Sequence, residues 1–146
     1  MNQPDLMDVS YCAFSNLRRA ARVVSHLYDD ILKPTGLKTT QCMVLATIGR
    51  SGKSTVTELA DAMTMDQTSM TRALNVLHKQ GLVERIFDEA DRRRRLITLT
   101  AKGEEILELA MELRAQAQTK MIEMLGDDNL LHSIELLRLM TTQAQR

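Results

Sequence analysis

Four consecutive arginines at positions 92–95 are the densest group of charges in the chain. Guanidinium groups bind phosphates well, and each phosphate contact with a nucleic acid releases condensed counterions. The first three lie between two short runs of strand-forming residues, 82–87 and 95–99, and Arg95 begins the second run. The arginines are therefore expected at the tip of a β-hairpin. The alternative to a polyanion contact is a solvated turn. The residues expected to contact the minor groove of DNA or its phosphates are Arg92, Arg93 and Arg94.

Two short helices are predicted immediately before this hairpin, over residues 55–63 and 64–80. Each begins with the spacing of a capping box, in which a threonine is followed three residues later by Glu or Gln. Gly81 then occupies the position at which helices commonly end in a left-handed residue. Two helices with almost no linker cross at a steep angle, as in a helix-turn-helix. Together with the hairpin they predict a winged helix, within a mainly α (α+β) fold.

The side of the second helix that faces away from its apolar stripe carries polar side chains that suit base recognition. Amides pair with adenine edges, and threonine methyls contact thymine methyls in the major groove. Asp66 and Asp91 are acids next to this surface, and we hypothesise that they hold arginines in place by bidentate pairing. The candidate base-reading residues are Gln67, Thr68, Thr71 and Asn75, with Ser69 and Arg72 flanking them toward phosphates.

The composition is typical of a globular domain that is mainly helical. The chain has 146 residues, of which 44% are hydrophobic and only 3% aromatic, a balance that favours helices over sheets. The formal net charge is +0, so attraction to nucleic acid must come from a local basic patch. The sequence contains no enzyme motif, metal-ligand spacing or phosphate-binding loop, and its start does not resemble a signal peptide. We expect a cytoplasmic protein that is not an enzyme and needs no cofactor.

The predicted terminal helices, within residues 8–34 and 100–146, are apolar around a wide arc. A helix that is apolar on more than one side must be buried on more than one side. The simplest cover is a second copy in an isologous two-fold dimer, and the alternative is one compact helical monomer. We therefore expect one domain over residues 1–146, with dimerisation helices at 8–34 and 100–146 and a DNA-binding lobe at 39–99. A helix-turn-helix that reads palindromic DNA also needs two copies at a fixed spacing.

The chain has two cysteines, Cys12 and Cys42, which do not suggest a disulfide framework. Cys42 lies in an apolar stripe and is interpreted as a core residue. Cys12 is interpreted as a small packing residue, with a redox sensor as the alternative. A sensor cysteine would need a lowered pKa and hydrogen-bonding partners.

The order of these parts resembles the MarR family of bacterial transcriptional regulators, over nearly the whole chain. The most specific similarity is the wing and the helix start after it, from Asp88 to Gly103, in which Glu89 replaces a proline that is frequent in the family. The resemblance implies a homodimer with intertwined terminal helices and two winged-helix lobes on operator DNA. Further similarities lie at Leu37, Gln41, Thr57-Glu58-Leu59-Ala60, Met70-Thr71-Arg72, Leu77 and Gly81-Leu82-Val83.

The resemblance also implies a response to a small ligand, often a phenolic or aromatic carboxylate, or to an oxidant. In the family the ligand lodges between the dimer helices and each lobe, so its walls would come from the first, second and fifth helices. The sequence thus predicts a sequence-specific transcriptional regulator, a homodimeric repressor that a small ligand releases from a palindromic operator. Two alternatives remain open: oxidant sensing through Cys12, as in one branch of the family, and a winged-helix module that docks on protein without DNA binding.

Overall fold

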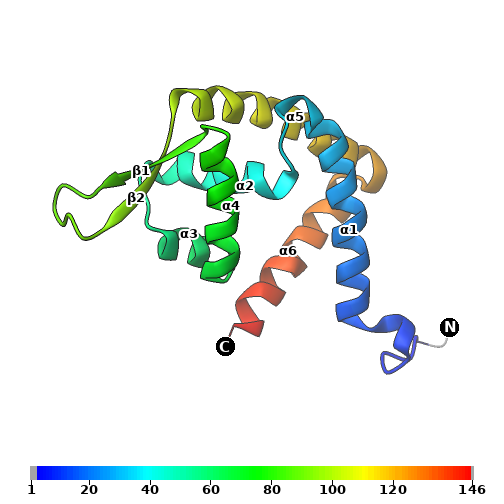
Figure 1. The fold of residues 1–146 in the computed structure, drawn as a ribbon. Coiled ribbons are helices and arrows are strands. Elements are labelled where there is room, and N and C mark those ends of the chain that lie inside the picture. The colour runs from blue at the N-terminus through cyan, green and yellow to red at the C-terminus, as the bar shows by residue number, and fades with distance from the viewer. Residues whose placement is uncertain (1–2, 146) are drawn as a thin grey trace.

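The computed structural model describes residues 3–145. Figure 1 shows a lobe of short helices with a projecting hairpin on one side and long helices on the other. The architecture is the predicted mainly α winged helix, with a two-stranded antiparallel sheet. In chain order the elements are the 3₁₀ turn η1 (Val9–Tyr11), α1 (Ala13–Leu32), the 3₁₀ turn η2 (Lys33–Thr35), α2 (Thr39–Ser51), α3 (Val56–Ala62), α4 (Gln67–Lys79), β1 (Val83–Phe87), β2 (Arg95–Leu99), α5 (Ala101–Leu125) and α6 (Asp127–Ala144).

The lobe is built around one apolar core, to which α2, α3, α4 and β2 all contribute. α4 presents Met70, Leu74 and Leu77 to this core at helical spacing, and none of the three has exposed surface. Complete burial of each such side chain contributes about 1.5–3 kcal/mol relative to exposure. The core therefore fixes the rotation of α4 about its axis, and with it the side of α4 that faces solvent.

The hairpin is fastened to the lobe at its base and closed at its tip. β1 and β2 pair over their full lengths. Ser54, just before α3, exchanges two backbone hydrogen bonds with Ile97 of β2, at 3.1 and 2.7 Å. At the other end the backbone N–H of Asp88 donates to the carbonyl of Arg94 at 3.1 Å. The hairpin consequently projects as one piece from the lobe (Figure 1).

The start of α5 lies directly against the segment that follows α4. The Thr100 hydroxyl accepts from the backbone N–H of Gly103 at 3.0 Å and donates to the carbonyl of Gly81 at 2.6 Å. Lys102 donates to a carbonyl at the end of α4 at 2.9 Å. A Cβ atom at Gly103 would collide with the carbonyl oxygen of Leu82. Glycine is therefore required at 103 by the close approach of two backbone segments.

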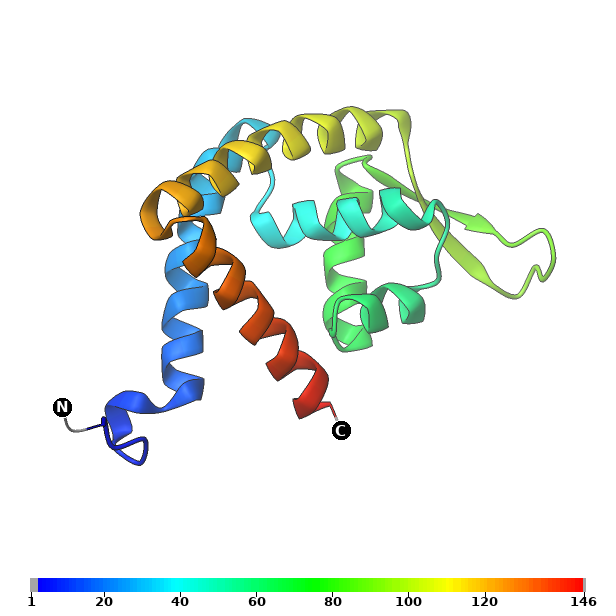
Figure 2. The ribbon, with the colours of Figure 1, turned by 180° about the vertical axis from the view of Figure 1, so that it is seen from behind.

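The long helices leave much apolar surface uncovered in the single chain. In both views α5 runs across one end of the lobe, and α1 and α6 extend from the region of its C-terminal end (Figures 1 and 2). Phe14 and Val23 of α1 are 68% and 67% exposed, and Leu131 of α6 is 58% exposed. The wide apolar arc predicted for the terminal helices is thus exposed to solvent in the single chain.

Two helix starts differ from the sequence-based expectation. The second helix of the pair is expected from residue 64, but α4 starts one residue after Asp66, which accepts the backbone N–H of Ser69 at 2.8 Å. Aspartate is among the best N-cap residues, and Thr64 adopts a left-handed φ of 54°, outside a right-handed helix. The first dimerisation helix is expected from residue 8, but Asp8 caps only η1, and α1 begins at Ala13.

Candidate nucleic-acid interface

The residues predicted to read bases share the solvent side of α4. Gln67, Thr71 and Asn75 recur at four-residue spacing and are termed the α4 row. Because the opposite side of α4 is locked into the core, the backbone beneath the α4 row is held in place. Residues four apart on a helix lie on the same side, one turn above another. Of the predicted set, Ser69 is half-buried, and the exposed members are Gln67, Thr68, Thr71, Arg72 and Asn75.

Both ends of the α4 row are held by neighbouring elements. The amide nitrogen of Gln67 donates to the Thr57 hydroxyl of α3 at 3.1 Å. The amide oxygen of Asn75 accepts from Arg85 Nη2 of β1 at 2.6 Å. Arg85 is not among the residues predicted from the sequence, because its contact depends on the angle at which β1 leaves α4. The available sequence signal was an arginine in the strand that directly follows the second helix of the pair.

The predicted wing arginines lie in two different environments. Arg92 and Arg93 are exposed, and within residues 3–145 neither forms an ion pair. Arg94 lies 3.4 Å from the carboxylate of Glu58 on α3 and 3.6 Å from that of Asp88. Arg94 thus links the hairpin tip to the helix-turn-helix, while Arg92 and Arg93 keep their guanidinium groups available to a polyanion.

The two acids expected to hold arginines make other contacts in the described part of the chain. Asp66 caps α4 and accepts the backbone N–H and the hydroxyl of Ser69, both at 2.8 Å; these bonds, the backbone one first, lower the pKa of the Asp66 carboxyl. Asp91 accepts the backbone N–H of Arg93 at 3.0 Å. Short acidic side chains take up nearby backbone donors readily, because little chain must be ordered to reach them. In the described part of the chain, the acids that contact a wing arginine are Glu58 and Asp88, both against Arg94.

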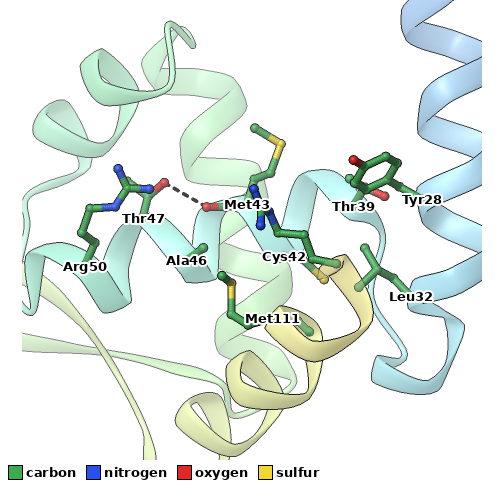
Figure 3. Close-up of a pocket in the computed structure, with 11 residues that line it drawn as sticks. Tyr28, Leu32, Thr39, Cys42, Met43, Ala46, Thr47, Arg50 and Met111 are labelled. Carbon is green, nitrogen blue, oxygen red and sulfur yellow. Dashed lines mark hydrogen bonds between the residues drawn. The ribbon is translucent and has the colours of Figure 1, made fainter. Parts of the chain in front are cut away.

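A pocket of about 420 Å³ opens between α1, α2 and α5. In the close-up, Cys42, Met43 and Ala46 of α2 lie between Tyr28 of α1 at one end and Arg50 at the other (Figure 3). The wall is mainly apolar and includes no acid among its lining residues. The remaining lining residues are Leu32, Thr39, Thr47, Ala110, Met111 and Arg114.

Hydrogen bonds tie α1 to the other two walls of this pocket. The Tyr28 hydroxyl donates to the side-chain oxygen of Gln118 on α5 at 3.0 Å. Asp29 accepts the backbone N–H and the hydroxyl of Thr39 at 2.7 and 2.8 Å, and the backbone bond is the main cause that lowers the pKa of the Asp29 carboxyl. Asp29 therefore caps the start of α2 from a different helix. The pocket lies where the arm of long helices is joined to the lobe.

The two cysteines differ in setting. Cys12 is the N-cap residue of α1 and is half-buried, and the nearby backbone N–H and hydroxyl of Ser15, the backbone group first, lower the pKa of its thiol. Cys42 belongs to the apolar core, where burial raises the pKa of its thiol. Among residues 3–145 no group of His, Cys, Asp and Glu side chains could hold a metal ion. The same residues form no helix with the length and apolar character needed to cross a membrane.

Comparisons with known proteins agree with this architecture. The family model described as MarR family matches residues 35–94. YhbI of Bacillus subtilis (strain 168), described as an uncharacterised HTH-type transcriptional regulator, is 29% identical over 97 residues, which is 66% of this chain. That match spans 63% of YhbI, so the chain covers less than two thirds of this relative.

Two solved structures of regulators are similar over almost the whole chain. The M. tuberculosis transcriptional regulator MosR, solved in complex with DNA, is 37% identical, with a TM-score of 0.77 and coverage of 92% of this chain and 98% of MosR. A mutant of MarR from E. coli, solved with operator DNA, is 26% identical, with a TM-score of 0.82 and coverage of 92% and 97%. The family match, the fold and the identity to MosR together show that the chain belongs to the MarR family of winged helix-turn-helix transcriptional regulators, DNA-binding proteins rather than enzymes.

Proposed function

We propose that this protein is a homodimeric repressor that binds a palindromic DNA operator and leaves it when a small ligand binds. The observation that carries the proposal is the joint exposure, on one lobe, of the α4 row and of Arg92 and Arg93 in the wing. The major groove admits an α-helix, and phosphate contacts from the wing would fix the register of that helix. MosR and MarR have been solved with DNA, which supports the same partner for this chain.

The proposed roles divide the predicted residues by the groups they reach. Arg72 and the half-buried Ser69 lie beside the α4 row and are assigned to phosphates. Arg92 and Arg93 are assigned to the minor groove or its phosphates, and Arg94 additionally holds the wing against α3. The proposed base readers are Gln67, Thr68, Thr71 and Asn75.

The homodimer is supported by the apolar surface of the long helices. Exposed side chains of this size, such as Phe14, Val23 and Leu131, are rarely gathered on a monomer without a partner. A second copy of the chain would cover them through the same surface on both subunits. The proposed division of the chain is therefore dimerisation helices within 8–34 and 100–146 and a DNA-binding lobe within 39–99.

The pocket between α1, α2 and α5 is the proposed inducer site. Its volume of about 420 Å³ is within the range usual for small-molecule sites, roughly 300–1,000 Å³. Arg50 and Arg114 offer positive charge beside apolar walls, and Tyr28 offers an aromatic face. These features suit a small aromatic or phenolic carboxylate. Because the pocket separates the long helices from the lobe, a ligand there would alter how the two lobes are spaced.

Salt dependence tests the proposed DNA contact. The protein is titrated against DNA from the region flanking its own gene, and the dissociation constant is measured by fluorescence anisotropy at several salt concentrations. Two wing arginines per lobe give four phosphate contacts in a dimer, so the log–log slope of affinity against salt is expected to be about −4 or steeper. If the protein binds no promoter fragment even at low salt, the result would instead support the alternative of a winged-helix module that docks on protein.

A second candidate function is oxidant sensing through Cys12. The lowered pKa of its half-buried thiol favours it, because the thiolate attacks a peroxide, forms sulfenic acid and releases hydroxide. Under this function, hydrogen peroxide weakens operator binding by the parent chain at least about tenfold, while Cys12→Ser keeps its affinity. Cys42→Ala serves as the matched control and should respond as the parent does. Equal responses of the parent and Cys12→Ser would remove Cys12 as a sensor.

A further inference from the structure

The proposed DNA-binding function leaves Arg85 of β1 without a role. Its Nη2 donates to the amide oxygen of Asn75 at 2.6 Å, and no carboxylate pairs with it within residues 3–145. Both side chains are exposed on the surface of the lobe. An arginine without an acid partner therefore lies next to an amide of the α4 row, where its charge and its remaining N–H groups are open to a ligand.

The chemistry of this contact fixes which way the amide of Asn75 points. A guanidinium group has N–H donors and no acceptor, so the oxygen of Asn75 must face Arg85 and its NH₂ group must face away. The amide of Gln67, at the other end of the α4 row, contacts the hydroxyl of Thr57. A hydroxyl both donates and accepts, so the amide of Gln67 can be reversed without losing its partner. Asn75 thus has a set orientation that Gln67 lacks.

This orientation decides which base edge suits Asn75. Bidentate pairing with adenine needs the amide oxygen to accept from N6 and the amide NH₂ to donate to N7. Arg85 takes one of the two acceptor positions of the amide oxygen and places a positive charge beside it, where the N6 hydrogens of adenine would approach. Guanine presents two acceptors, N7 and O6, at the same edge. The NH₂ group of Asn75 and a free N–H of Arg85 together form a donor-only pair that matches those acceptors.

We propose, resting on the proposed DNA-binding function, that Arg85 is a specificity-determining residue that turns Asn75 from an adenine reader into a donor that selects guanine. The Arg85–Asn75 hydrogen bond acts in two ways: it sets the direction of the Asn75 amide, and it places the positive charge of Arg85 beside that amide. The proposal concerns one base pair in each half-site, and it leaves the phosphate contacts of the wing unchanged.

The experiment selects bound sequences from a library of randomised duplex DNA with the full-length protein at one salt concentration, followed by sequencing. The parent chain is expected to enrich guanine at one position of each half-site. Arg85→Met frees the amide oxygen of Asn75 and should shift that position toward adenine, with about a tenfold change in the relative affinity of the two bases. Asn75→Ala should reduce the guanine preference, and the double variant Asn75→Ala/Arg85→Met should show no gain for adenine.

Arg95→Met is the matched control, because Arg95 is also in the hairpin but stacks on Phe87, with its guanidinium carbon 4.0 Å from the ring centroid. It removes one positive charge and should lower affinity for all sequences while leaving the base preference in place. The proposal is overturned if Arg85→Met keeps the parent preference at every position, or if its shift toward adenine persists in the double variant. Failure of the parent chain to enrich any sequence would instead count against the proposed DNA-binding function.

Discussion

Replacing Arg92 and Arg93 together with alanine is expected to weaken operator binding by about 100-fold or more near physiological salt. The two side chains are exposed and form no ion pair in the described part of the chain, so the free protein should lose little stability. Four phosphate contacts would be lost per dimer. The log–log slope of affinity against salt should therefore become shallower by roughly 4. Fluorescence anisotropy with the operator fragment measures both quantities.

A charge-matched control separates local contact from net charge. Arg19→Ala/Arg22→Ala removes two arginines per chain from exposed positions on α1, away from the hairpin (Figure 1). This variant has the same net charge as the wing variant. Because both residues lie in a proposed dimerisation helix, size-exclusion chromatography first checks that the variant is as dimeric as the parent. Its operator affinity should then stay within about threefold of the parent, since only the long-range field changes. Equal losses in the two variants would show that the wing makes no specific contact. Full affinity in the wing variant would contradict the proposed interface.

Substitution of alanine for Gly103 is expected to destabilise the protein by about 1–3 kcal/mol. The new Cβ would collide with the backbone carbonyl oxygen of Leu82, which cannot turn aside as a side chain can. The hydrogen bonds of Thr100 to Gly81 and Gly103 would have to lengthen if the two segments moved apart. Urea denaturation followed by circular dichroism, at one fixed protein concentration, measures the free energy of unfolding.

Gly49→Ala is the control for this substitution, because Gly49 is also a helical glycine. A Cβ there would lie 2.6 Å from a methyl carbon of Leu107, at the end of a flexible side chain that can change rotamer. Alanine also favours a helix by about 1 kcal/mol relative to glycine. Gly49→Ala should therefore change stability by less than about 1 kcal/mol. A Gly103→Ala variant as stable as Gly49→Ala would show that the two backbones are not tightly packed.

Contacts between residues close in the sequence were predictable, because their geometry depends on few dihedral angles. The capping box of α3 is confirmed: Glu58 N–H donates to the Thr55 hydroxyl at 3.2 Å, and Thr55 N–H donates to the Glu58 carboxylate at 2.8 Å. The helical range expected from residue 100 begins at the cap of α5, because the Thr100 side chain accepts the backbone N–H of Gly103. The equivalent prediction for α4 was wrong, since the Thr64–Gln67 spacing competes with Asp66, a charged residue that is preferred over threonine at N-caps.

Contacts between elements were not predictable, because they depend on how the elements cross. The Asn75–Arg85 and Glu58–Arg94 contacts join residues that no local pattern pairs. The pocket illustrates the same point. The resemblance implied walls from the first, second and fifth helices, and a pocket does lie between α1, α2 and α5. Its individual lining residues, such as Arg50 and Arg114, follow from helix crossing angles that hydrophobic periodicity does not specify.

The joint between α4 and α5 has a mechanical consequence. Hydrogen bonds from Thr100 and Lys102 connect the first turn of α5 to the end of α4. At Gly103 the backbone of α5 packs so closely against the backbone of Leu82 that not even a methyl group would fit between them. Two turns further along, Met111 and Arg114 of the same helix line the pocket. α5 is thus a lever arm with a ligand-sized opening beside its middle. Its first turn is attached to the helix that we propose enters the major groove. Tilting of that arm would rotate the whole lobe, so under the proposed function a molecule in the pocket would alter DNA affinity without touching any residue that is proposed to contact DNA.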